Sequence, residues 1–171
     1  MKKMRQLFLF TILFFMIMLA ACSSPEAEEI LDIHNGYVDN VNPKIDEVDQ
    51  VYEKINAAQS DEEVMDIRET ELTSIVLEVK EYIDSQDPET EEAKEYHQIR
   101  ADWASAWYDV IDLENEATQG TIDGSLTEEE ITELLMQAEE RGQEASELAE
   151  KGHEKIDELS DKYNFEDDED R

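Results

Sequence analysis

The feature that most constrains this chain is the spacing of its apolar residues, which recur every three or four positions from Ile30 to Tyr163. That period places them on one stripe of an α-helix, whereas a half-buried β-strand would alternate at every second residue. The sequence has no such alternating run, no hairpin signal and no internal repeat. It therefore predicts an all-α fold, an antiparallel up-down bundle of about four helices over residues 29–163.

The first predicted helix contains Gly36 and Pro43. A proline inside a helix removes one hydrogen bond and crowds the carbonyl four residues earlier, here that of Asp39. Alternatively, Asn42 would cap a new helix with Pro43 in its first turn. Because the apolar stripe keeps its phase across Pro43, we expect one helix with a kink there. The stripe consists of Ile30, His34, Tyr37, Val41, Ile45, Val48, Tyr52 and Ile55.

The second predicted helix follows the turn at residues 57–60 and ends at about Asp84. Ser60 is a suitable N-cap, and Glu63 three residues later completes a capping box. Arg68 falls on the apolar stripe, where an arginine usually reaches solvent or pairs with a carboxylate. An anion site inside the bundle is the functional alternative. The other stripe residues are Met65, Leu72, Ile75, Val79 and Tyr82.

The third predicted helix follows the turn at residues 85–88 and ends near Thr118. Asp87 is the expected N-cap, with Pro88 in the first turn. The helix carries two tryptophans, Trp103 and Trp107, which we expect to be core residues, with a ligand platform as the alternative.

The fourth predicted helix starts with a capping box formed by Thr127 and Glu130. Its stripe has large residues at both ends and small ones in the middle: Ile131, Leu134, Ala138, Gly142, Ala145, Leu148, Gly152, Ile156, Leu159 and Tyr163. A hairpin turning at about residue 122 would set Trp107 opposite Ala138 and Trp103 opposite Gly142. Large indoles opposite small residues make a dense core.

The first 22 residues have a different composition. Three basic residues precede an almost unbroken apolar run over residues 7–19, which is the layout of a secretory signal and is short for a bilayer span. The run ends in Leu19-Ala20-Ala21-Cys22, which resembles the lipobox of bacterial lipoproteins. The resemblance implies cleavage before Cys22, acylation of its sulfur, and an anchor on the extracytoplasmic face of the cell membrane. The alternative is an ordinary signal peptide with a cysteine nearby by chance.

The charge balance limits the possible partners. Residues 1–21 hold three of the 14 basic residues and none of the 47 acidic ones, so the mature chain would carry a net charge of −36. Such a field repels nucleic acid and attracts cations, cationic peptides or basic protein surfaces. The simpler interpretation is that the charge keeps the protein soluble. We expect a lipidated Cys22 and a short tether over residues 22–28, and an acidic tail over residues 164–171.

One segment, Asp123 to Glu130, resembles the second half of an EF-hand calcium loop. The resemblance puts Asp123, Ser125 and Glu130 in ligand positions. Gln119 and Thr121 stand where the first half of the loop would supply carboxylates, which lowers the expected affinity. The same residues also suit a turn followed by a helix cap, so Asp123, Ser125 and Glu130 are weak candidates for metal ligands.

No grouping of residues indicates catalysis. The chain has no Gly-x-Ser-x-Gly elbow and no glycine-rich phosphate loop. Glu150-x-x-His153 is the only Glu-x-x-His, whereas a di-metal carboxylate site in a bundle needs a pair. We therefore expect a non-enzymatic module without a cofactor, anchored at the cell envelope, that contacts an envelope protein, a cationic peptide or a cell-wall component. In general style it resembles small helical lipoproteins of Gram-positive bacteria. The alternatives are a calcium-responsive module using residues 123–130 and, less favoured, a carboxylate-site metalloenzyme.

Overall fold

The computed structural model describes residues 24–165, which are helical apart from short connections and contain no β-strand. The predicted all-α fold class is confirmed. Residues 1–21, Cys22 and the last six residues of the expected acidic tail lie outside the described residues. The elements are α2 (Pro25–Asn40), α3 (Asn42–Ala57), α4 (Asp61–Ile67), the π-helical turn η1 (Arg68–Leu72), α5 (Thr73–Asp84), α6 (Glu91–Asp123) and α7 (Glu128–Tyr163).

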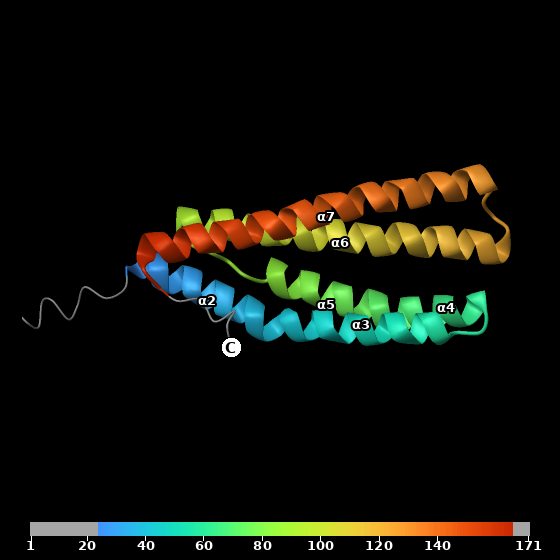
Figure 1. Ribbon diagram of the computed structural model, residues 1–171, viewed down its shortest axis with the longest axis horizontal. Helices are drawn as coiled ribbons and strands as arrows, with labels where there is room; N and C mark the ends of the chain where they lie inside the picture. Colours follow the sequence, from blue (N-terminus) through green and yellow to red (C-terminus); the bar gives the residue numbers. More distant parts are fainter. Residues whose placement is uncertain (1–23, 166–171) are drawn as a thin grey trace, which may run out of the picture.

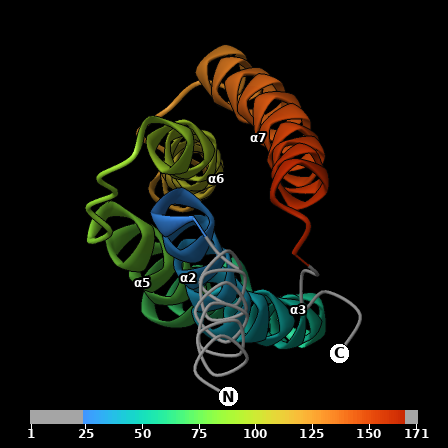
Figure 2. The ribbon, with the colours of Figure 1, turned by 90° about the vertical axis from the view of Figure 1, so that its left-hand side faces the viewer.

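The two longest helices form one side of the molecule. Helices α6 and α7 lie side by side and are joined by a short loop at one end (Figure 1). The α3–α4 connection lies at that same end, while the start of α2 and the end of α7 lie at the opposite end (Figure 1). Seen along the long axis, α6 lies between α7 and α5 (Figure 2). Within residues 24–165, no helix is both long and apolar enough to span a bilayer.

Three apolar clusters follow one another along this length. The first joins α2, α6 and α7, the second adds α5, and the third joins α3, η1, α5 and α6. Their largest fully buried members include Ile30, Tyr96, Ile111, Leu72 and Ile156. Helix α2 therefore packs in clusters with α5, α6 and α7, whereas α3 packs in a cluster with η1, α5 and α6. The packing partners of the chain change between α2 and α3.

That change takes place at Val41, between α2 and α3. Val41 is fully buried and keeps helical backbone angles, and its N–H still donates to the carbonyl of Tyr37 at 2.8 Å. The helix is interrupted because Pro43, in the first turn of α3, has no N–H to donate. The expected single kinked helix is thus two helices, with Pro43 in the first turn of the second, as in the alternative, but with Val41 and not Asn42 as the N-cap. Beyond it the stripe shifts, since Val51 is buried while Ile45 and Tyr52 remain more than one third exposed.

At its N-terminal end, the domain begins earlier than expected. We expected residues 22–28 to form a tether, but Pro25–Glu28 belong to the first turns of α2. The Ser24 hydroxyl accepts a hydrogen bond from the Ala27 N–H at 3.2 Å, and Pro25 suits a first turn because its missing N–H would have no partner there. At the other end, Phe165 is also part of the packed domain, stacked on Tyr163 with ring centroids 6.5 Å apart.

The second predicted helix is confirmed over its length, with Ser60 as its N-cap, but it contains an unpredicted π-helical turn. The N–H and the hydroxyl of Thr73 both donate to the carbonyl of Arg68, five residues earlier. This wider turn changes the phase of the helix after Leu72. As a result Val76 and Ile83 are buried, whereas the expected stripe residues Ile75 and Tyr82 are only partly buried.

Both predicted ends of the third helix were wrong. The N-cap of α6 is Thr90, not Asp87. The Glu29 carboxylate of α2 accepts hydrogen bonds from the N–H groups of Thr90 and of Glu89 just before it. The helix continues past Thr118 to Asp123. It ends where Gly124 adopts a left-handed conformation with φ of 66°, which glycine adopts without steric cost.

This longer helix moves the register of the α6–α7 hairpin. Gly142 faces Val110, because a methyl group added at position 142 would stand 4.0 Å from the valine Cγ2, and Gly152 faces Arg100. The hairpin therefore turns at about residue 126, and the expected pairs of Trp107 with Ala138 and Trp103 with Gly142 were wrong. Trp103 is a buried core residue, as predicted, and packs in the cluster that contains Ala145.

Candidate functional site

The calcium-like segment serves as a helix boundary in this structure. One oxygen of Asp123 accepts a hydrogen bond from the Ser125 N–H at 2.9 Å. One oxygen of Glu130 accepts from both the N–H and the hydroxyl of Thr127, each at 2.8 Å, and completes the predicted capping box. Both carboxylates thus make local hydrogen bonds at the two ends of the loop.

These bonds also affect ionisation. The Ser125 hydroxyl, the Gln119 amide and the Ser125 N–H together hold the pKa of Asp123 below its ordinary value. The N–H and hydroxyl of Thr127 do the same for the pKa of Glu130. Among residues 24–165, no group of three or more histidine, cysteine, aspartate or glutamate side chains is arranged to hold a metal ion.

A buried polar cluster lies where α2, α6 and α7 meet, and sequence reasoning missed it. Arg100 is only 3% exposed, and its Nε donates to the Tyr96 hydroxyl at 3.1 Å. That hydroxyl lies 2.9 Å from Nδ1 of His34. The guanidinium carbon also lies 4.2 Å from the ring centroid of Tyr37, a cation–π geometry. In the described part of the chain, Arg100 forms no salt bridge, and its Nη2 has no hydrogen-bond partner.

A second, partly buried polar cluster lies at the π-helical turn. Arg68 pairs with a carboxylate, as predicted: Nη2 lies 2.6 Å from the carboxylate of Glu114, and Nε donates to the Asn115 side chain at 2.8 Å. The Asn115 amide in turn donates to the Thr73 hydroxyl at 2.9 Å. Burial and the Glu114 charge raise the pKa of nearby Tyr52, although Arg68 opposes this shift. Because Arg68 is already paired with Glu114, we interpret this cluster as one that stabilises the fold and not as an anion-binding site.

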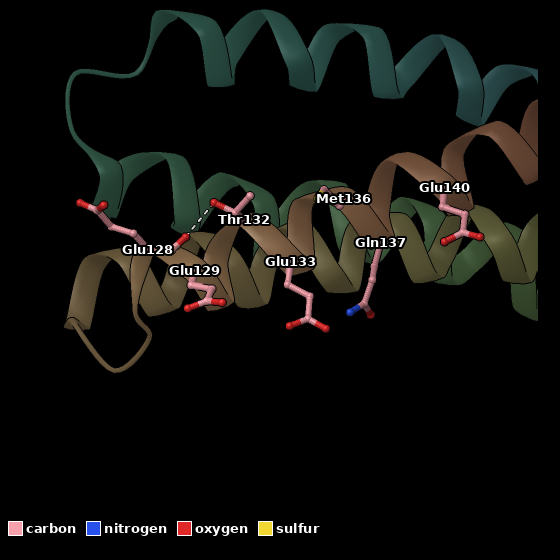
Figure 3. A pocket seen from close by; sticks show the side chains of 7 residues that line it. All are labelled: Glu128, Glu129, Thr132, Glu133, Met136, Gln137 and Glu140. Atoms are coloured by element: carbon pink, nitrogen blue, oxygen red, sulfur yellow. Dashed lines mark hydrogen bonds between the residues drawn. The ribbon is translucent and has the colours of Figure 1, made fainter.

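An open surface rich in carboxylates lies on the first half of α7. We call it the acidic face and define it by seven residues that line a shallow hollow (Figure 3): Glu128, Glu129, Thr132, Glu133, Met136, Gln137 and Glu140. Met136 is 66% exposed and its neighbour Leu135 is 49% exposed, the two highest values among the large apolar residues of the described chain. The face therefore combines carboxylates with an accessible apolar side chain.

The carboxylates of the acidic face lack salt-bridge partners within the described chain, although the charge of Arg141 acts on the adjacent Glu140. Among residues 24–165, none of its four glutamates forms a salt bridge, whereas further along α7 Arg141 pairs with Glu144 and Lys155 pairs with Glu95. The reason is in the sequence: residues 101–140 contain 12 acidic residues and no lysine or arginine. The absence of basic residues between Arg100 and Arg141 is the sequence feature that could have predicted the acidic face.

The acidic face is exposed because few elements pack against this half of α7. Among the described helices only α6 and α2 pack against α7. The residues of α7 that share clusters with α2 begin at Ala145 and extend to Tyr163. The first turns of α7 therefore rest on α6 alone, which leaves the opposite side open to solvent.

The chain matches no protein-family model, no curated protein and no solved structure.

Proposed function

We propose that the chain is a lipid-anchored, non-enzymatic interaction module on the extracytoplasmic face of a bacterial cell membrane, built as an up-and-down bundle. The observation that carries this proposal is the position of α2, whose N-cap, Ser24, comes two residues after Cys22. A lipid on Cys22 would hold the bundle directly by the start of α2, with almost no flexible linker.

The long helices extend away from that end. Helix α7 has 36 residues, which corresponds to a length of about 54 Å. Its last turns pack against the first turns of α2, and its start lies at the far end of the molecule (Figure 1). The net charge of −36 expected for the mature chain repels anionic headgroups and favours an upright bundle. In this orientation the acidic face lies far from the bilayer, where an envelope protein, a cationic peptide or a cell-wall component can reach it.

The anchor is tested by the fate of the full chain in a bacterial host. We expect mass spectrometry to find a mature protein that begins at an acylated Cys22 and fractionates with membranes. The Cys22→Ala variant should leave the membrane fraction after salt washing and keep its helical circular dichroism. A mature chain that begins elsewhere, or a Cys22→Ala variant that stays on the membrane, would contradict the proposal.

The orientation is tested by fluorescence quenching in liposomes. With Cys22 acylated, a cysteine introduced at Asp87 or at Ser125 would be the only free thiol for a dye. Both positions are exposed and lie in loops towards opposite ends of α6. We expect a lipid-bound quencher to act strongly on the dye at position 87 and weakly at position 125. Equal quenching at both positions would show a bundle that lies flat on the bilayer.

A further inference from the structure

We propose that the acidic face of α7 binds a basic amphipathic helix of a partner protein. This inference rests on the proposed function as an interaction module, and it specifies both the surface and the chemistry of the partner. The three observations that carry it are an uncovered helix face, an exposed methionine on that face, and a set of carboxylates that form no salt bridge within residues 24–165.

The uncovered face provides the contact area. Met136 and Leu135 are adjacent on the half of α7 that packs only on α6. Two smaller hollows adjoin the acidic face where α7 meets α6, and both share Gln137 with it. Apolar side chains line these hollows as well, namely Leu113, Leu126 and Leu134. Methionine suits such a surface because its flexible, polarisable side chain adapts to different apolar partners.

The charges decide what kind of partner fits. Four glutamates line the same hollow as Met136, and the basic residue next to them, Arg141, is already paired with Glu144. Lysine and arginine side chains flanking an apolar stripe would supply the missing counter-charges and cover the methionine at the same time. Nucleic acid and anionic lipid would meet a field of their own sign.

The shape of the face favours a helix over an extended peptide. The acidic face runs along three turns of α7, from Glu128 to Glu140, which is about 18 Å. A partner helix of similar length would place apolar residues at helical spacing against Met136 and the adjoining hollows. An extended peptide gains most of its affinity from strand pairing, and the described chain has no sheet edge to offer.

The test uses the full lipidated chain in a neutral detergent at about 150 mM salt, where long-range attraction is screened. The first probe is a dye-labelled lysine–leucine peptide with leucines at helical spacing. The second has the same composition with the leucines in scrambled order. By fluorescence anisotropy we expect saturable one-site binding of the first peptide and at least about tenfold weaker binding of the second. Equal binding of the two peptides would overturn the proposal.

Two matched pairs of variants locate the site. Replacing Glu129, Glu133 and Glu140 by Gln should weaken binding by about tenfold, whereas the same change at Glu147, Glu150 and Glu154, exposed residues of the second half of α7, should weaken it about twofold or less. Met136→Ser should weaken binding about fivefold or more, whereas Leu77→Ser, at a 39% exposed position on α5, should have no effect.

The outcomes separate the two proposals. If both triple variants weaken binding equally, the peptide responds only to the overall charge and the acidic face is not a site. If Met136→Ser binds as well as the unaltered chain, the apolar contact is absent. Either result would overturn this inference while leaving the membrane anchor, tested through Cys22, intact.

Discussion

The guanidinium of Arg100 lies directly against the backbone of Gly152. A methyl group at position 152 would stand 2.9 Å from both Cζ and Nη1 of the arginine, closer than a methyl group normally approaches. The arginine is held in place from two other sides, because Nε bonds to the Tyr96 hydroxyl and Cζ lies over the Tyr37 ring. The side chain of Arg100 on α6 thus contacts both α2 and α7.

The first prediction concerns the two glycines of α7 that face α6. Gly152→Ala should lower the free energy of unfolding by about 1–3 kcal/mol, because the added methyl forces Arg100 out of its packed position. Gly142→Ala should instead raise it by up to about 1 kcal/mol, since the nearest atom, Cγ2 of Val110, is 4.0 Å away and alanine favours the helix. Denaturant unfolding measures both. Stabilisation by both substitutions would contradict the close contact at Gly152.

The second prediction separates the charge of Arg100 from its packing. Arg100→Met keeps most of the volume and removes a buried charge that has no salt bridge among residues 24–165, so stability should change by less than about 1 kcal/mol. Arg100→Ala leaves a cavity and should cost about 3 kcal/mol. Thermal and denaturant unfolding of the two variants give the comparison. An equally large loss in both would mean that the charge, not the side-chain volume, stabilises the junction.

For the α6–α7 hairpin, the sequence predicts the helices and one helix cap but not the register between the two helices. The apolar stripes and the Thr127 cap were predictable because they depend on residues that are neighbours along one helix. The register was not predictable, since Gly120 resembles a helix end, whereas helix α6 continues to its C-cap at Gly124. The predicted register is displaced from the observed one by about seven residues, or about two turns, and stripes match almost equally well after such a shift. Only the observed packing distinguishes the two registers.

Two other features depended on contacts that the sequence does not display. At the start of α6, the carboxylate of Glu29, 61 residues before Thr90, accepts hydrogen bonds from the N–H groups of Glu89 and Thr90. The π-helical turn requires Asn115 of α6 to hold Thr73 and Arg68 together. The acidic face could have been predicted from the sequence, because residues 101–140 contain no lysine or arginine.

The third prediction tests the cluster at the π-helical turn. Asn115→Ala removes the acceptor for Arg68 Nε and the donor for the Thr73 hydroxyl, so it should destabilise the protein by about 1–3 kcal/mol. Asn56→Ala, at an exposed position on α3, should change stability by less than about 0.5 kcal/mol. The double variant Asn115→Ala with Thr73→Val should lose less than the sum of the single losses, because the two residues share one network. Additive losses would contradict that coupling.

The last prediction follows from the Glu29 carboxylate, which joins α2 to the residues before α6. Burial raises the pKa of Glu29, but hydrogen bonds from the N–H groups of Glu89 and Thr90 and from the Thr90 hydroxyl outweigh it and hold the pKa below its ordinary value of 4.5. A carboxyl with a lowered folded-state pKa stabilises the protein above its unfolded-state pKa, and this contribution is lost as pH falls through the folded-state value. Glu29→Gln should therefore be less stable than the unaltered chain at neutral pH, and the difference should shrink at pH values below 4.5.

Comparing the two proteins at each pH removes the general effect of acidification on the other carboxylates, which both share. Denaturant unfolding between about pH 7 and about pH 3 supplies the measurement. Asp32→Asn, at an exposed position on the same helix, is the control and should stay close to the unaltered chain throughout. A Glu29→Gln difference that remains constant down to the lowest pH would mean that the charged carboxylate does not hold α2 against the start of α6.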